Sequence, residues 1–304
     1  MAISRGQLVK ELEPGLNALF GLEYKRYENQ HAEIYTTESS DRAFEEEVML
    51  SGFAQAQTKS EGAGVTFDNA QETYTARYTH ETVALAFSIT EEAIEDNLYD
   101  RLASRYTKAL ARSMANTKQV KAVAPLINGL PTNDAFDSGD GVSLFNTAHP
   151  TIAGTVKNTL TTQADLNETS LEQSLIDIAA MTDERGLKIA ARGVKMIVPS
   201  ELQFTAERLM KSQGRVGTAD NDINAIVSMG MVPQGYRVNN FLTDPNAFFL
   251  ITDVPNGMKH FVRTPIKTAM EGDFDTGNLR FKARERYQFG VSDFRGIFGS
   301  PGVS

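Results

Sequence analysis

Residues 71–89 read QETYTARYTHETVALAFSI, and their apolar and polar side chains alternate as they do along a β-strand. The apolar positions are Tyr74, Ala76 and Tyr78 and then, beyond His80-Glu81, Val83, Leu85, Phe87 and Ile89. One strand of this length would span about 60 Å, whereas strands in compact domains usually contain about 5–6 residues. The stretch therefore predicts either an arm that leaves the body and lies on a neighbouring molecule, or two ordinary strands divided at His80-Glu81.

The segment before this ribbon, residues 34–70, is polar, and its strongest loop signal is TKSEGAG at residues 58–64. Together the two segments predict an extended two-stranded finger whose tip lies near residues 60–64. The first 33 residues carry apolar side chains at helical spacing, interrupted at Pro14-Gly15. They are interpreted either as a partly helical N-terminal arm or as an ordinary first helix on the core.

The composition is that of a globular protein, with 304 residues of which 41% are hydrophobic and 23% are charged. Because the chain has no cysteine, disulfides, thiolate metal sites and cysteine nucleophiles are excluded. The N-terminus lacks the apolar core of a signal peptide, and no run approaches the roughly 20 apolar residues that span a bilayer. We therefore expect a soluble protein without membrane contact, made in a cytoplasm. The net charge of −9 argues against a dedicated nucleic-acid binder.

A long helix is predicted to follow the ribbon and to end at Pro125. Ser88 and Glu91 fit a capping box, and Thr90 is an alternative N-cap. Apolar residues then recur at four-residue intervals, at Ile94, Leu98, Leu102, Tyr106, Leu110 and Met114. Acidic residues gather early and basic residues late, as the helix dipole favours. About 34 residues would make a rod of about 50 Å, roughly three times the average helix length.

The middle of the chain predicts an α/β lobe of about 120 residues. A turn-rich passage at residues 126–158 is followed by an amphipathic helix with Asn167 or Thr169 as its cap. Residues 194–198 form a short apolar strand, and Pro199-Ser200 opens another helix.

The last 60 residues return to β-structure. Residues 248–252 and 259–263 flank VPNG at 254–257, which predicts a hairpin, and a further strand follows at 266–270. The final strand alternates apolar residues with a basic stripe at Arg280, Lys282, Arg284 and Arg286. This stripe is interpreted as pairing with acidic residues such as Glu91, Glu92, Glu95 or the run at 45–47, within or between subunits, or as a solvated strand face.

This order of parts resembles the major capsid protein family of tailed bacteriophages, and most closely the major head subunit of Mu-like phages. The phrases that carry the resemblance are LFNTAHP at 144–150, KMIVPSEL at 195–202 and FKARERYQFGV at 281–291. The resemblance implies an α+β, Hong Kong 97-like major capsid fold. It divides the chain into an N-terminal arm (1–33), an extended β-hairpin loop (34–88), a peripheral domain with a spine helix (89–125), an axial α/β domain (126–247) and returning β-strands of the peripheral domain (248–304).

The same resemblance implies a non-enzymatic head subunit without cofactors. It would self-assemble as hexamers and pentamers into an icosahedral shell around double-stranded DNA, in the bacterial host cytoplasm, and reside in the virion. The partners implied are other copies of the chain, portal and decoration proteins, and packaged DNA through weak non-specific contact. A weak phosphate-facing surface is the third interpretation of the basic stripe. Many members carry an N-terminal scaffolding segment, and since little sequence precedes the arm here, we expect a separate scaffold protein.

The residues expected to make inter-subunit contacts are those of the finger. They are Lys59, Ser60, Glu61, Gly62 and Gly64 at the tip, with Phe67, Tyr74 and Tyr78 as aromatic anchors. The alternative is that these aromatic side chains cap the chain's own core.

Other classes of protein have less support. The four histidines are scattered, and no phosphate-binding or nucleophile motif is present. His149 with Asp134, Asp137 and Asp140 could be drawn into a metal site, but the spacing does not fit a calcium loop, and a polar surface loop is the simpler interpretation. A tail-tube or decoration subunit is the remaining alternative, although such proteins are typically smaller, mostly β, and lack so long a helix.

Overall fold

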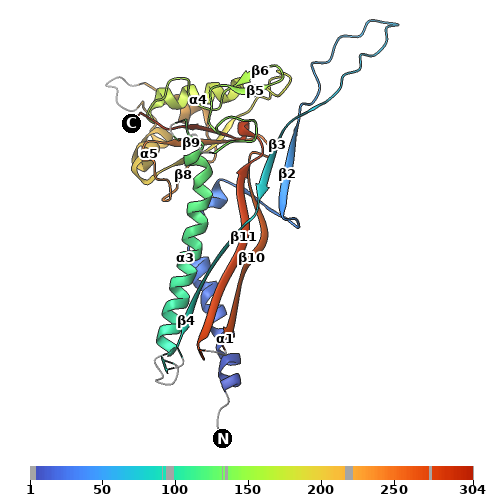
Figure 1. The fold of residues 1–304 in the computed structure, drawn as a ribbon. Coiled ribbons are helices and arrows are strands. Elements are labelled where there is room, and N and C mark those ends of the chain that lie inside the picture. Colours follow the sequence, from blue (N-terminus) through green and yellow to red (C-terminus); the bar gives the residue numbers. More distant parts are fainter. Residues whose placement is uncertain are drawn as a thin grey trace.

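The computed structural model describes residues 5–303 except 91, 94–98, 132, 134–135, 216–221 and 274–275. A long stem carries a head at one end, and a finger projects from the junction between them (Figure 1). The stem contains helices α1 (Arg5–Arg26) and α3 (Tyr99–Asn128), which pack against a four-stranded sheet. The strand order is β1-β10-β11-β4, formed by β1 (Thr36–Ser39), β10 (Met258–Gly272), β11 (Leu279–Val291) and β4 (Glu81–Ile89).

The stem is held together by a small apolar core between its helices and its sheet. Strand β11 alternates strictly, so that Phe281 and Ala283 are buried while the basic side chains between them face outward. Leu16 and Phe20 of α1 and Met114 of α3 pack in the same cluster. The alternation predicted for the last strand is confirmed.

Helix α3 does not end where the sequence predicted. It continues through Pro125 to Asn128, because Leu126 is fully buried and holds the last turn in the core. At the other end, Ser88 lies in β4 opposite Arg280 and caps nothing, whereas the Thr90 hydroxyl accepts a hydrogen bond from the Ala93 amide at 3.4 Å. This contact belongs to helical residues 92–93, whereas α3 begins at Tyr99, so neither predicted cap is observed at the start of α3. The expected helical residues Ile94 and Leu98 lie outside the described part of the chain.

The N-terminal segment is an ordinary helix packed on the stem. Helix α1 runs without interruption through Pro14, so the break predicted at Pro14-Gly15 is wrong. Burial of Leu16 and Phe20 just beyond the proline outweighs the hydrogen bond that proline cannot donate. A short 3₁₀ helix, η1 (Gln30–Glu33), then leads into β1.

The ribbon at residues 71–89 is two strands that belong to two sheets. Strand β3 (Glu72–Thr79) pairs with β2 (Phe44–Leu50), while β4 pairs with β11. The division falls at His80, the only residue between β3 and β4. The β2–β3 pair and residues 51–70 beyond it form the finger.

The head combines residues of the predicted α/β lobe with two strands from the last 60 residues, in a sheet of strand order β12-β9-β7-β8. Its strands are β12 (Ile297–Ser300), β9 (Phe248–Thr252), β7 (Gly193–Val198) and β8 (Tyr236–Val238). Its helices are α4 (Glu168–Ala180), α5 (Gln203–Lys211) and α6 (Ala225–Met229), with short elements η2 (Ser200–Leu202), η3 (Phe294–Gly296), β5 (His149–Thr151) and β6 (Gly154–Val156). The predicted cap at Asn167 is confirmed, because its side chain accepts a hydrogen bond from the Ser170 amide.

Two expectations about the end of the chain require correction. Strands β9 and β12 pair within the head sheet, so residues 248–304 do not all return to the stem. Residues 254–257 form a turn, with Asn256 at φ 59°, but β9 and β10 on either side of it belong to different sheets and do not form a hairpin. Strand β9 is nearly continuously apolar, as expected of a strand buried inside a sheet. Among the described helices none is both long and apolar enough to cross a membrane.

Candidate inter-subunit surfaces

The outer part of the finger makes few contacts with the rest of its own chain. Every residue from 52 to 71 is exposed, including Phe67 at 94%, Val65 at 69% and Phe53 at 62%. The predicted tip is a turn in which the Ala63 amide donates to the Ser60 carbonyl at 3.1 Å, with Gly62 at φ 79°. Lys59, Ser60, Glu61, Gly62 and Gly64 all lie at this end (Figure 1). Apolar side chains gathered on a protruding ribbon are typical of a surface that another chain covers.

The base of the finger, in contrast, is fixed to the body by charged contacts. Lys259 of β10 is 6% exposed and its ammonium group contacts Glu47 of β2 and Glu38 of β1. Arg185 of the head donates to the Asn69 carbonyl at 2.6 Å and lies 4.0 Å from the Asp68 carboxylate. These contacts join residues more than 100 positions apart in the sequence, so no local pattern could have predicted them.

Tyr74 and Tyr78 belong to this fixed base. Tyr78 is 2% exposed, its ring packs edge-on against Phe261 with centroids 4.8 Å apart, and its hydroxyl contacts the Ser292 hydroxyl. The Tyr74 hydroxyl donates to the Ser292 carbonyl at 3.4 Å. This corrects the expectation that both anchor a neighbour, because they cap the chain's own core. Of the three predicted aromatic anchors, Phe67 alone is free to contact another copy.

A compact hydrogen-bonded joint lies where the finger meets the stem. The Ser40 hydroxyl donates to Glu45 at 2.6 Å and accepts from His80 Nε2 at 2.8 Å. Burial, together with Arg286 and Arg263 nearby, lowers the pKa of His80 below its ordinary value. Through Ser40, the neutral imidazole of His80 therefore connects the junction of β3 and β4 to the residue after β1 and to Glu45 of β2.

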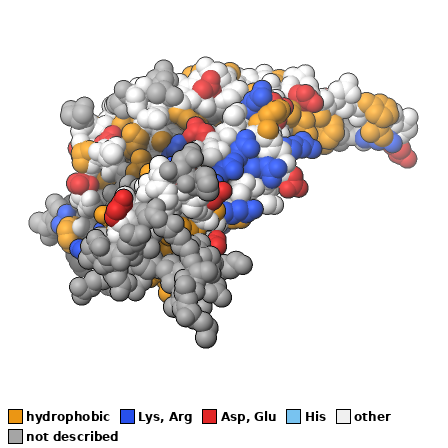
Figure 2. All heavy atoms as spheres, turned by 60° about the horizontal axis from the view of Figure 1, so that its bottom comes forward, with side chains coloured by type: hydrophobic (Ala, Val, Ile, Leu, Met, Phe, Trp, Pro, Cys, Tyr) orange, Lys and Arg blue, Asp and Glu red, His pale blue; other side chains and the backbone are white. Residues whose placement is uncertain are grey.

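The basic stripe lies on the face of β11 that points away from the helices. Arg280, Lys282 and Arg284 are exposed and Arg286 is half-buried, and Figure 2 shows lysine and arginine side chains gathered between the body and the finger. Arg280 pairs with Asp273 at 2.5 Å, while Lys282 and Arg284 have no ion-pair partner within the described residues. The acidic run at 45–47 contacts Ser40, Arg77 and Lys259 instead. Pairing between the run and the stripe within one chain is therefore not observed, and Glu91 and Glu95 lie outside the described residues.

A buried polar cluster connects α1, α3 and the stem sheet. Glu285 is 1% exposed and receives Lys118 at 3.3 Å and the Tyr24 hydroxyl at 3.2 Å. Burial raises the pKa of Glu285, although Lys118 opposes the shift.

Burial and the nearby Lys118 charge lower the pKa of His31 to about 4 and that of His260 to about 3. The rings of these histidines contact each other with centroids 5.3 Å apart, and both contact Phe289.

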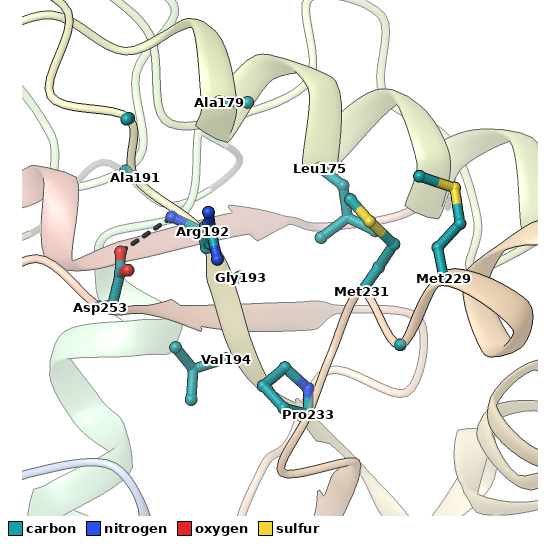
Figure 3. Close-up of a pocket in the computed structure, with 12 residues that line it drawn as sticks. Leu175, Ala179, Ala191, Arg192, Gly193, Val194, Met229, Met231, Pro233 and Asp253 are labelled. Atoms are coloured by element: carbon teal, nitrogen blue, oxygen red, sulfur yellow. Dashed lines mark hydrogen bonds between the residues drawn. The ribbon is translucent and has the colours of Figure 1, made fainter.

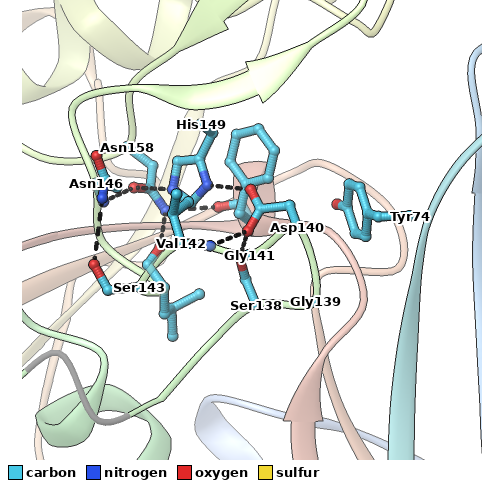
Figure 4. A network of polar contacts seen from close by, with 12 residues as sticks. Tyr74, Ser138, Gly139, Asp140, Gly141, Val142, Ser143, Asn146, His149 and Asn158 are labelled. Atoms are coloured by element: carbon cyan, nitrogen blue, oxygen red, sulfur yellow. Dashed lines mark hydrogen bonds and ion pairs between the residues drawn. The ribbon is translucent and has the colours of Figure 1, made fainter.

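His149 is buried in the head, so the interpretation of its segment as a polar surface loop is wrong at this residue. Its ring is fully buried, stacks on Phe294 at 3.8 Å, and bridges Asp140 at 2.6 Å and the Asn158 side-chain carbonyl at 3.0 Å (Figure 4). Burial acts to raise the pKa of Asp140, but hydrogen bonds from His149 and Ser138 hold it below its ordinary value. Asp137 accepts two backbone amides, and Asp134 lies outside the described residues. Across the described ranges no group of three or more acidic or histidine side chains is placed to hold a metal ion.

Comparison with solved structures finds the same fold in phage capsids. The capsid of an empty GTA particle matches with a TM-score of 0.58 at 12% identity, over 90% of this chain and 89% of that one. The capsid of cyanophage P-SCSP1u matches with a TM-score of 0.55 at 11% identity, over 89% of this chain and 86% of that one. The capsid of Myoviridae phage XM1 matches with a TM-score of 0.52 at 11% identity, over 89% of each chain. No curated protein sequence matches the chain.

The sequence profile of the family described as phage capsid protein matches residues 73–299, which span β3, both long stem strands and the head. This match covers well over half of the chain, and the α+β fold agrees with the structural neighbours. A capsid family indicates a structural rather than an enzymatic role. The chain therefore belongs to the phage capsid protein family, and it is a major capsid protein with a Hong Kong 97-like fold.

Proposed function

We propose that this chain forms the shell of an icosahedral phage head as hexamers and pentamers, and that its finger lies on an adjacent subunit. The observation that carries the proposal is the uncovered finger, in which residues 52–71 are all exposed although they include Phe53, Val65 and Phe67. Each such contact can be modest, because every subunit makes several at once and closure of the shell multiplies their effect. Residues 59–64 and Phe67 are the contact residues of this proposal.

The stem and the head would take different places in the shell. The stem corresponds to a peripheral domain with α3 as its spine, and the head to an axial domain near the centre of each ring. The enclosed cargo is double-stranded DNA, and the further partners are a scaffold, a portal and decoration proteins. Assembly would take place in the bacterial host cytoplasm, and Mu-like phages would hold the nearest relatives. These assignments rest on the family resemblance of phrases such as 144–150 and 281–291.

The test is assembly of the purified chain, followed by electron microscopy. Deletion of residues 60–64 should leave folded subunits that fail to close shells. Phe67→Asp should have the same effect, because it places a charge in the covered apolar contact. Thr66→Asp is the matched control, since it adds the same charge at the adjacent exposed position. Normal shells from both the deletion and Phe67→Asp would show that the finger is dispensable.

A further inference from the structure

The head contains an apolar cavity of about 720 Å³ between α4, the start of β7 and the loop after α6 (Figure 3). Its lining includes Leu175 and Ala179 of α4, Val194 of β7, and Met229, Met231 and Pro233. Met229 is 70% exposed. Methionine side chains adapt readily to a partner's shape, so the mouth of this cavity is suited to receive an apolar side chain.

A protruding apolar side chain lies on another part of the same head. Phe204, in the first turn of α5, is 70% exposed. Strand β7 connects the two features, because residues 192–194 line the cavity at the start of the strand and η2 and α5 follow its end. A six-residue strand spans about 20 Å, so the cavity and Phe204 lie at opposite ends of one strand.

The two features also carry complementary charges. Arg192 is exposed at the rim of the cavity, and its guanidinium has no ion-pair partner among the residues described. Asp253 also lines the cavity, but its carboxylate is engaged by the Arg192 backbone amide at 2.8 Å. Glu201 is exposed three residues before Phe204, and among the residues that the structure describes its carboxylate contacts only the neighbouring Ser200 hydroxyl. A cation beside the cavity and an anion beside the phenylalanine would favour a single orientation of contact.

We propose that Phe204 of one copy enters this cavity in the next copy of a ring, with Glu201 beside Arg192. The inference rests on the proposed function, since it specifies a partner surface within each hexamer or pentamer. Rings are built from heterologous contacts, in which two different patches of one chain meet. The finger's Phe67 is a poorer occupant, because the adjacent Asp68 already accepts the Ala54 amide and lies beside Arg185.

The first test replaces Phe204 and exchanges the charges of Arg192 and Glu201. The quantity measured is the protein concentration at which rings and shells appear. Phe204→Ala should raise that concentration about tenfold or more, as expected for an aromatic residue that is central to an interface. Arg192→Glu and Glu201→Arg should each raise it several-fold, and the double variant should restore assembly. Arg208→Glu, a charge change on the same exposed helix, is the matched control and should leave assembly near normal.

Cysteine cross-linking provides the second test, because the natural chain has no cysteine. Phe204→Cys combined with Met231→Cys, treated with a short bismaleimide in assembled shells, should give a ladder of linked chains on a denaturing gel. The single variants should give none. A ladder from Phe67→Cys with Met231→Cys would make the finger the occupant and overturn the inference. Shells that form without cross-linking and without any response to Phe204→Ala would also overturn it while leaving the proposed function intact. Absence of rings and shells from the unaltered chain produced together with its scaffold would overturn both.

Discussion

His31 and His260 are buried as neutral rings beside the ammonium group of Lys118. Their pKa values of about 4 and about 3 lie below the ordinary value of 6.5, so the unfolded chain takes up protons at a higher pH than the folded chain. Each ring therefore contributes stability that is complete above about pH 6.5 and is lost as the pH falls toward 4 for His31 and toward 3 for His260. Glu285 acts in the opposite direction, because its raised pKa favours protonation of the folded state, and this partly offsets the loss.

Replacement of His260 by phenylalanine should make the fold less sensitive to acid. The stacked contact with Phe289 is kept while the titrating group is removed, so the decrease in melting temperature between pH 6.5 and pH 4 should be smaller than in the natural chain. The change in stability across this interval is on the order of several kcal/mol per buried histidine. Thr37→Val removes the hydroxyl 3.2 Å from His260 without removing a titrating group, and should shift stability by a similar amount at each pH. An unchanged pH profile in His260→Phe would contradict the assignment.

Gly290 of β11 is required because the finger base packs directly against it. A Cβ at this position would lie 2.8 Å from Cδ1 of Tyr78, and the ring cannot move far because it is enclosed. Gly290→Ala should therefore lower the free energy of unfolding by about 1–3 kcal/mol, as overpacking usually does. Urea unfolding measures the change. Gly272→Ala, at the exposed end of β10 with no atom within 4 Å, should have a much smaller effect, and equal losses in the two variants would argue against the clash.

Strands and helices were predictable wherever local pattern and packing agree. The alternation along β11, the cap at Asn167 and the loop at residues 58–64 were all visible in the sequence, because each depends on neighbours along the chain. The joint at His80 could not be decided from alternation, which continues across it. The choice depends on pairing with β2 on one side and β11 on the other, and these partners are distant in sequence.

The same limit explains the errors at Pro14 and Pro125. A proline inside a helix costs about 3 kcal/mol, which makes a helix end the better local prediction. Burial of Leu16, Phe20 and Leu126 against the rest of the molecule offsets this cost, and that burial depends on tertiary structure. Tyr74 and Tyr78 could not be assigned for a related reason, since their partners Phe261 and Ser292 are about 180 or more positions further along the chain.

Arg185 of the head fixes the orientation of the finger, because its guanidinium donates a hydrogen bond to the Asn69 carbonyl. Arg185→Ala removes the bond to the Asn69 carbonyl. The bonds from the Ser51 amide to the Gln71 carbonyl and from the Gln71 amide to the Ser51 hydroxyl should then open more often. Hydrogen exchange at these two amides should become several-fold faster, while exchange in the core strand β7 stays unchanged. Lys188→Ala, an exposed cation three residues away with no ion-pair partner in the described chain, is the control. Equal exchange in all three proteins would show that Arg185 does not hold the finger.

The stem presents one cationic face in a chain whose net charge is −9. We propose that Lys282 and Arg284 pair with acidic side chains of a neighbouring subunit. Lys282→Glu with Arg284→Glu should then raise the concentration needed for assembly several-fold, since weak exposed pairs repeat throughout a shell. Folding should be unaffected, because both side chains are exposed.

Arg105→Glu with Lys108→Glu makes the same charge change on the exposed surface of α3 and should assemble more readily than the stripe variant. Normal assembly of the stripe variant with weaker retention of DNA would assign the stripe to packaged DNA. Normal behaviour in both assays would assign it to solvent.

One residue, His80, joins a strand of the finger to a strand of the stem. Because Tyr74, Tyr78 and Lys259 fix the base of this strand, the part free to move is the exposed segment beyond residue 71. A near-extended path from residue 71 to residue 62 reaches about 30 Å, so a rotation of about 10° where that segment begins displaces the tip by about 5 Å. The finger therefore acts as a lever, and a small torsional change at its pivot could match it to neighbours inclined at different angles. Under the proposed function, a single polypeptide could in this way accommodate both five and six neighbours while the four-stranded sheets of the stem and the head remain unaltered.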